Sequence, residues 1–130
     1  MISILVQDDG FQPWSQSVLR KAPLFLNATA TPEEVDLKVV QDDHDNMIII
    51  DFANFSDGRG FSIAHNLRLQ GFDGQLLAKG HVISDQYRHV RQSGFDGVLL
   101  TEEQSKRMPE AYWQEQAARV RISYRDRIYG

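Results

Sequence analysis

One short segment of the chain carries side chains and backbone groups that could hold an anion. Gly58 and Gly60 flank Arg59, with Asp57 just before them and Ser62 just after. Glycine permits positive φ and lets backbone N–H groups face outward, and a guanidinium offers a planar fork of donors. The first turn of a following helix would add unpaired N–H groups and a favourable dipole. The segment is therefore a candidate site for phosphate, sulfate, sulfite or a carboxylate.

A simpler interpretation of the same segment stays open. Asp57-Gly58 is an ordinary turn sequence, and Arg59 could pair with Asp51 or Asp57 and only lock the loop. The pattern matches neither a Walker loop nor a dinucleotide-binding fingerprint. The residues predict a binding loop without naming its ligand.

A second polar group, His81 with Asp85 and Gln86, follows the next predicted strand. Because parallel strands end at the same edge of a sheet, we expect His81 to lie near Arg59. His81 is the candidate general acid or base, and a capping or surface role is the alternative. No set of nucleophile, base and orienting group can be assembled, and no two histidines have metal-ligand spacing. The sequence thus predicts ligand binding without a cofactor or a metal.

Composition limits the class of protein. The chain has 130 residues, 42% hydrophobic and 25% charged, which is typical of one soluble domain. Its net charge of −4 argues against nucleic-acid binding over the whole surface. The absence of cysteine excludes thiol catalysis and thiolate-bound zinc in this chain. The apolar run Met47–Ile50 is too short to span a membrane, and no signal peptide is visible, so the expected location is the cytoplasm.

Periodicity predicts an α/β fold. The segment Gly-Phe-Asp-Gly occurs twice, starting at 71 and 94, each time between a predicted helix and a predicted strand. Glycine would end each helix in a left-handed conformation, Phe would turn inward, and Asp-Gly would turn into the strand. Short connections of this kind give parallel strands with right-handed crossovers. We therefore expect a compact β-α-β-α-β parallel core, similar to part of a β/α barrel, with additional strands from the N- and C-termini.

This fold divides a single domain, 1–130, into three parts: N-terminal strands and loops at 1–46, the core at 47–100, and a C-terminal helix and strand at 101–130. The predicted strands are 2–6, 11–14, 35–39, 47–52, 75–78, 98–100 and 120–124. The predicted helices are 60–70, 83–90 and 109–118, with a capping box at Thr101 and Gln104 and an acidic turn at 42–46.

Several ordered motifs resemble those of a bacterial family, domain of unknown function 934. Residues 55–64, FSDGRGFSIA, with Leu67 and Arg68 after them, resemble its F-x-D-G-R-G-[YF]-S-x-A-x-x-L-R signature. The further matches are GFDGQL at 71–76, Gly80 with Val82, Asp85 and Gln86, and Arg91 with Gly94-Phe95-Asp96. The resemblance covers about residues 47–100, and His81 stands where the family usually has Asp.

The resemblance implies a role rather than a reaction. Members of this family are usually encoded beside assimilatory sulfite reductase, which implies an accessory role in sulfite reduction, with the reductase or a small anion as partner. The "oxidoreductase" label that many members carry has no flavin, haem or nicotinamide site here to justify it. Two alternatives stay open: a small enzyme acting on a phosphorylated or sulfur-containing metabolite, and a structural homodimer that pairs through 120–124.

Overall fold

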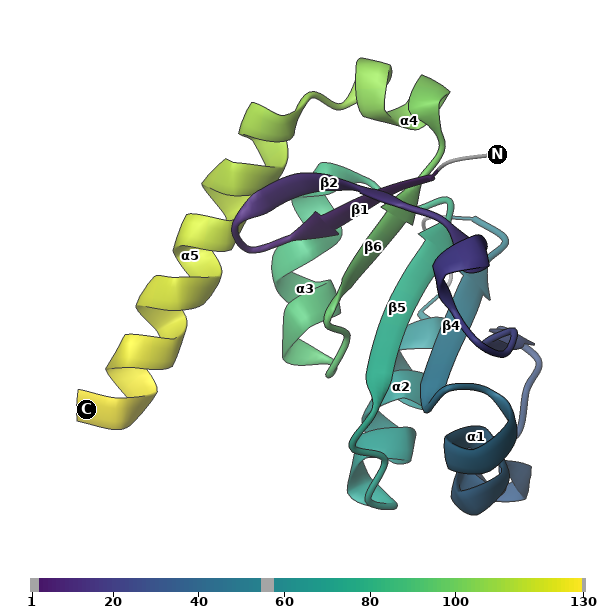
Figure 1. Cartoon of the computed structure of the whole chain (residues 1–130). Helices are drawn as coiled ribbons and strands as arrows, with labels where there is room; N and C mark the ends of the chain where they lie inside the picture. The colour runs from purple at the N-terminus through teal and green to yellow at the C-terminus, as the bar shows by residue number, and fades with distance from the viewer. Residues whose placement is uncertain (1–2, 55–57, 130) are drawn as a thin grey trace.

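The computed structural model describes residues 3–54 and 58–129, with residues 121–129 described by their backbone alone. Six strands form one sheet, with helices packed against it (Figure 1). The strands are β1 (Ser3–Gln7), β2 (Gly10–Trp14), β3 (Leu24–Asn27), β4 (Met47–Phe52), β5 (Gln75–Gly80) and β6 (Gly97–Leu100). The helices are α1 (Leu37–Asp43), α2 (Arg59–Leu69), α3 (Tyr87–Gln92), α4 (Glu102–Arg107) and α5 (Glu110–Tyr129), and short 3-10 turns are η1 (Gln16–Val18), η2 (Pro32–Glu34) and η3 (Ser84–Gln86).

The sheet has a parallel part and an antiparallel part. In the order β2-β1-β6-β5-β4-β3, the last four strands are parallel, and β1 and β2 add an antiparallel hairpin beside β6. Consecutive parallel strands are neighbours, so their crossover helices lie on one face, as in part of a β/α barrel. The predicted β-α-β-α-β core is confirmed, and β3 extends it by one parallel strand that was not predicted.

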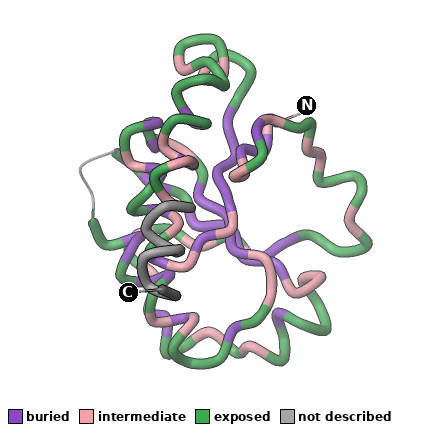
Figure 2. Tube along the Cα trace, turned by 90° about the vertical axis from the view of Figure 1, so that its left-hand side faces the viewer, coloured by how far each residue is buried: buried purple, intermediate pink, exposed green. Residues whose placement is uncertain are grey.

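Both faces of the sheet are apolar because its central strands are buried on both sides. In β4, Ile48, Ile50 and Phe52 face the helices, whereas Met47 and Ile49 face the other way. The helix side holds the larger core cluster, which takes in α1, α2, α3 and α5. Figure 2 shows these buried stretches gathered in the middle of the molecule. A strand buried on both faces needs a continuous apolar run, which is why β4 was predictable.

A single irregular segment covers the second face. Because β2 and β3 lie at opposite edges, residues 15–23 must cross the whole sheet between them. Five strand spacings amount to about 24 Å, a span that nine residues can cover although Gln16–Val18 form the turn η1. Trp14 and Leu19 pack on this side against the smaller core cluster, which consists of Leu5, Met47, Ile49, Leu77 and Leu99.

The first Gly-Phe-Asp-Gly segment ends α2 as predicted. Gly71 has φ 103, its N–H donates to Arg68 O at 3.0 Å, and the Phe72 N–H donates to Leu67 O at 3.0 Å. This pair of bonds is a Schellman cap. The Phe72 side chain is buried.

The second segment repeats the arrangement at the end of α3. Gly94 has φ 109, and the N–H groups of Gly94 and Phe95 donate to Arg91 O and Val90 O at 3.1 and 3.2 Å. Phe95 is fully buried. The structural interpretation of the repeat, as a device that ends a helix and starts a strand, is confirmed.

An arginine precedes each repeat and binds the next unit of the fold. Arg68 donates to Phe72 O at 3.0 Å and to Gly74 O and Gly94 O at 2.9 Å, and it pairs with Asp96 at 3.0 Å. Its partners therefore come from both helix-to-strand turns. The arginine thus joins the two repeats.

The second arginine makes the same kind of contacts at the end of the parallel series. Arg91 donates to Phe95 O at 2.5 Å and pairs with Asp8 at 3.0 Å. Asp8 belongs to the turn between β1 and β2 and also accepts from the Tyr87 hydroxyl at 2.5 Å. The hairpin therefore takes the place that a further repeat would occupy.

The predicted strand at 35–39 is wrong, because α1 begins there. The Asp36 side chain accepts from the N–H groups of Lys38 and Val39 and caps the helix. Val40 is buried, whereas Val39, which an alternating strand pattern would bury, is 42% exposed. The helix continues to Asp43, so only the end of the predicted acidic turn, with Asp45 and Asn46 at φ 52 and 53, is a turn.

The predicted C-terminal strand at 120–124 is also wrong, because these residues belong to α5. Trp113 and Ala117 are buried, and Val120 packs on the same core, at the four- and three-residue spacing of a helix. The arginines of this region therefore do not line a strand edge. In the described part of the chain, no helix is long and apolar enough to cross a membrane.

Candidate functional site

The carboxyl ends of β4, β5 and β6 form one edge of the sheet. We call the described residues that follow these strands, 53–54, 58–60, 80–86 and 101–104, the strand-end rim. The His81 N–H donates to Phe52 O at 3.0 Å and ties the end of β5 to that of β4. Gln104 Nε2 donates to Gly80 O at 2.7 Å and ties α4 to the same point. Thr101 and Gln104 also form the predicted capping box at the start of α4.

The two glycines around Arg59 act differently from the expectation. Neither has positive φ: Gly58 has φ −76 and Gly60 lies inside the first turn of α2. Gly60 is buried, and a Cβ there would lie 2.4 Å from Cζ of Phe52. Neither glycine uses the positive φ that it permits, and glycine is needed at position 60 because α2 packs closely on β4.

Arg59 stands at the rim, where α2 begins. It is the first helical residue and its side chain is exposed. The preceding residue, Gly58, has no side chain that could accept the N–H groups of the first turn. Ser62 is exposed on the side of α2 that faces α3 and does not lie on the rim. Asp57 lies outside the described residues.

Of the second predicted group, the Gln86 side chain serves the fold, whereas His81 and Asp85 are exposed. His81 and Asp85 are exposed on the rim, whereas the Gln86 side chain accepts from the Ile83 N–H at 3.1 Å and caps η3. Gly80, just before His81, has φ +92. The structure therefore places Arg59 at the start of α2 and His81 directly after β5, with Gln86 holding the turn that follows.

A polar row beside the rim escaped the sequence analysis. On the face opposite the helices, Asp51 pairs in register with Asn27 on one side and Lys79 on the other, and all three are exposed. Lys79 Nζ lies 5.7 Å from the centre of the Phe25 ring. A Cβ at Gly80 would lie 2.4 Å from Asp51 Oδ1, so glycine makes room for this carboxylate. The signal in the sequence was the alternation within β4 and β5, which turns Asp51 and Lys79 to the same face.

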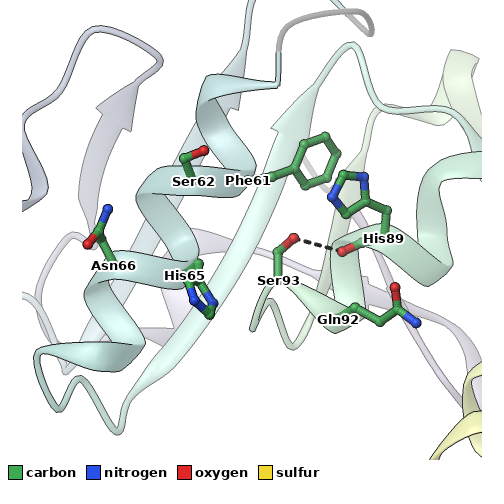
Figure 3. Close-up of a pocket in the computed structure, with 7 residues that line it drawn as sticks. All are labelled: Phe61, Ser62, His65, Asn66, His89, Gln92 and Ser93. Carbon is green, nitrogen blue, oxygen red and sulfur yellow. Dashed lines mark hydrogen bonds between the residues drawn. The ribbon is translucent and has the colours of Figure 1, made fainter.

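Figure 3 shows an open cleft between α2 and α3, about 450 Å³ in volume. The His89 ring stacks on Phe61 with 4.0 Å between ring centres, and the Ser93 hydroxyl donates to His89 O at 2.9 Å. The lining residues are Phe61, Ser62, His65, Asn66, His89, Gln92 and Ser93. His65 and His89 are exposed on helix faces. Within the described ranges, no three histidine or acidic side chains come together as metal ligands.

The clearest electrostatic perturbation lies at the opposite, amino end of the parallel strands. Burial raises the pKa of Tyr87 above its usual range, and the hydrogen bond to Asp8 raises it further. Burial lowers the pKa of Arg91, but its bond to Asp8 and the charge of Asp8 outweigh this effect and raise it. These groups anchor the β1–β2 turn, so their perturbation serves the fold.

Taken together, the fold and the rim define a small α/β protein with four consecutive parallel strands and an exposed cationic side chain at the carboxyl edge. The chain belongs to the family described as "Bacterial protein of unknown function (DUF934)", whose model matches residues 24–128. The match confirms the resemblance and extends it beyond residues 47–100 on both sides. Comparisons with curated proteins and with solved structures found no match.

Proposed function

We propose that this protein is a cytoplasmic accessory protein of assimilatory sulfate and sulfite reduction, which binds a small oxyanion or sulfite reductase through the strand-end rim. Its membership of the DUF934 family supports the pathway, because that family is expected to be encoded beside the reductase. The observation that carries the proposal is the position of Arg59, exposed at the start of α2 where β4 ends.

The rim offers the groups that an oxyanion requires. The Arg59 guanidinium supplies charge and a planar fork of donors, and the first turn of α2 supplies N–H groups that have no acceptor within the helix. His81 follows the neighbouring strand and presents an imidazole on the same edge. Exposed Asp85 limits the directions from which an anion approaches.

An enzyme of a phosphorylated or sulfur-containing metabolite is the weaker alternative. Such an enzyme needs Arg59 and His81 inside one concave pocket, with His81 as acid or base. Three clefts formed by described residues are lined by other side chains. The homodimer alternative loses the strand on which its pairing depended, because 120–124 is helical.

The test replaces Arg59 and compares it with an exposed arginine away from the rim. Arg59→Ala and Arg20→Ala are introduced into the gene of a host that grows on sulfate as its sole sulfur source. We expect the Arg59 variant to grow poorly and the Arg20 variant to grow normally, with both proteins melting like the wild type. Normal growth of the Arg59 variant contradicts the proposal.

Calorimetry with sulfite separates the two kinds of ligand. If the rim holds the anion directly, sulfite binds the isolated wild-type protein and at least tenfold more weakly the Arg59→Ala variant. If the rim holds the reductase, sulfite alone gives no heat, but the purified reductase binds. Binding of neither ligand overturns the proposal.

A further inference from the structure

The two edge strands of the sheet, β2 and β3, differ in whether their outward backbone groups can pair with another strand. The edge at β2 is closed. Gln7 and Gly10 form the pair next to the turn of the β1–β2 hairpin, so the N–H groups of positions 11 and 13 point away from β1. The Phe11 N–H donates to the Glu110 carboxylate at 2.6 Å, and position 13 is a proline without an N–H. The N–H of position 11 is therefore occupied and position 13 has none, so β2 offers no outward donor to another strand.

The edge at β3 has no such protection in the described part of the chain. β3 pairs only with β4, and its sequence Leu-Phe-Leu-Asn contains neither proline nor a charged residue. Phe25 is 49% exposed on the face away from the helices. An apolar strand with one free edge is a template for another extended segment.

A groove lies directly beside this edge on the helix side. Leu24 and Leu26 of β3 form one wall, and Val35 and Val39 form the other, around a volume of about 350 Å³. Leu24, Leu26 and Val35 are only partly buried, and Val39 is 42% exposed. A strand added to β3 would point every second side chain toward this side of the sheet, where the groove can receive apolar groups.

Negative charge is in excess beside the groove. Glu34 and Asp36 line it directly. Between residues 33 and 45 the chain carries six carboxylates and a single lysine, Lys38, and Lys21 pairs with one of these carboxylates, Asp43, at 3.7 Å. Bringing two copies together along β3 would place these carboxylates near each other, so charge disfavours a second copy and favours a basic partner.

We propose that the β3 edge and its groove form a docking site for an extended basic segment of another protein. The segment would pair its backbone with β3, place alternate apolar side chains in the groove, and set Lys or Arg against Glu34 and its neighbours. This site is distinct from the strand-end rim, and the proposal does not depend on an anion being bound there.

The probe is a labelled seven-residue peptide with an arginine at each end, leucines at positions 3 and 5 and threonines at positions 2, 4 and 6, so that arginines and leucines share one face of the added strand. We expect the wild-type protein to bind it, with perturbed amide signals at 24–27 in NMR spectra and affinity that falls as salt rises. Two matched peptides serve as controls: one with glutamates in place of the arginines, and one N-methylated at alternate backbone nitrogens. Each should bind at least tenfold more weakly.

Protein variants test the location. Val39→Lys introduces a positive charge into the groove at an exposed position, which removes an apolar contact and repels the arginines, and should weaken peptide binding about tenfold. Leu69→Lys is the matched control, since Leu69 is 72% exposed on α2 and away from the groove, and it should bind as the wild type does. Arg59→Ala should also leave peptide binding unchanged, so failure of the rim proposal and failure of this one are separable.

Three results overturn the proposal. One is the absence of binding at millimolar peptide. Another is equal binding by the Val39→Lys variant or by the N-methylated peptide. The third is a wild-type dimer in sedimentation that Val39→Glu dissociates, which would assign the edge to a second copy of the chain.

Discussion

Replacement of Gly60 by alanine separates a packing glycine from an anion-binding one. A Cβ at this position would lie 2.4 and 2.6 Å from two ring carbons of Phe52. The Phe52 ring is itself buried, with ring centres 5.1 Å from Phe61 and 5.9 Å from Phe95, so it has little room to retreat. Overpacking of this kind costs about 1–3 kcal/mol of unfolding free energy, and the upper half of that range is expected here.

One opposing effect reduces the loss. Alanine favours a helix interior over glycine by about 1 kcal/mol. The net loss for Gly60→Ala is therefore about 1–2 kcal/mol. For a domain of this size, this corresponds to a melting temperature lower by roughly 4–10 °C.

Gly58→Ala is the matched control in the same segment. Gly58 has φ −76, and no atom of the described residues lies within 4 Å of a Cβ placed there. We expect a change of at most about 0.5 kcal/mol, because alanine adopts this backbone conformation without strain.

The assay is thermal and urea unfolding of both variants, together with Gly60→Ala in a Phe52→Leu background. The smaller leucine should remove much of the cost of the alanine, giving a coupling energy between the two sites. A Gly60→Ala protein as stable as the wild type, or an equal loss in both backgrounds, refutes the packing explanation.

Three further predictions concern the bonds that hold the turns and the edge. Because the pKa of Tyr87 is raised in the folded state, its contribution to stability is complete below pH 10 and is lost as the pH rises above 10. Urea unfolding between pH 9 and 11 should show the wild type losing up to about 1.4 kcal/mol of unfolding free energy per pH unit more than Tyr87→Phe, and parallel curves contradict this. Asp96→Ala removes the carboxylate that pairs with Arg68 and accepts from a backbone N–H of β5, and should cost about 1–3 kcal/mol of unfolding free energy in urea. A loss below about 0.5 kcal/mol, on the order of a surface ion pair, is evidence against the proposed link between the repeats. Glu110→Ala frees an outward N–H of β2, so light scattering should show concentration-dependent association that the wild type lacks, and an unchanged monomer argues against edge protection by Glu110.

The parallel core was predictable because local signals and packing agree there. Met47–Ile50 is apolar throughout because both faces of β4 are covered there, and only Asp51 of the strand is exposed. The two Gly-Phe-Asp-Gly segments require glycine at φ 103 and 109, which no other residue adopts easily. Where neighbouring residues meet the requirements of the turn, the cap and the core together, a single sequence is enough to predict the element.

The errors arose where two periodicities overlap. Val35, Leu37 and Val39 alternate like a strand, but the Asp36 cap and the burial of Val40 favour a helix. The segment 120–124 also alternates, yet it continues a helical stripe that starts at Trp113. In both cases tertiary packing on the sheet decided between the two patterns.

The candidate site was predictable only in part. The positions of Arg59 at the start of α2 and of His81 after β5 were predictable, because parallel strands share their carboxyl edge. The packing role of Gly60 depends on the Phe52 ring, which is distant enough in the chain that spacing alone does not reveal the contact. Asp51 and Lys79 were missed because their partnership depends on the register between β4 and β5.

The most direct test of the central claim is a binding measurement between this protein and purified sulfite reductase, with free sulfite titrated in parallel. The wild type and Arg20→Ala are immobilised beside Arg59→Ala, and dissociation constants are compared at low and physiological salt. The strand-end rim predicts binding of one of these two ligands by the first two proteins and at least a tenfold loss in the third. Equal binding by all three proteins, or no binding of either ligand by the wild type, contradicts it.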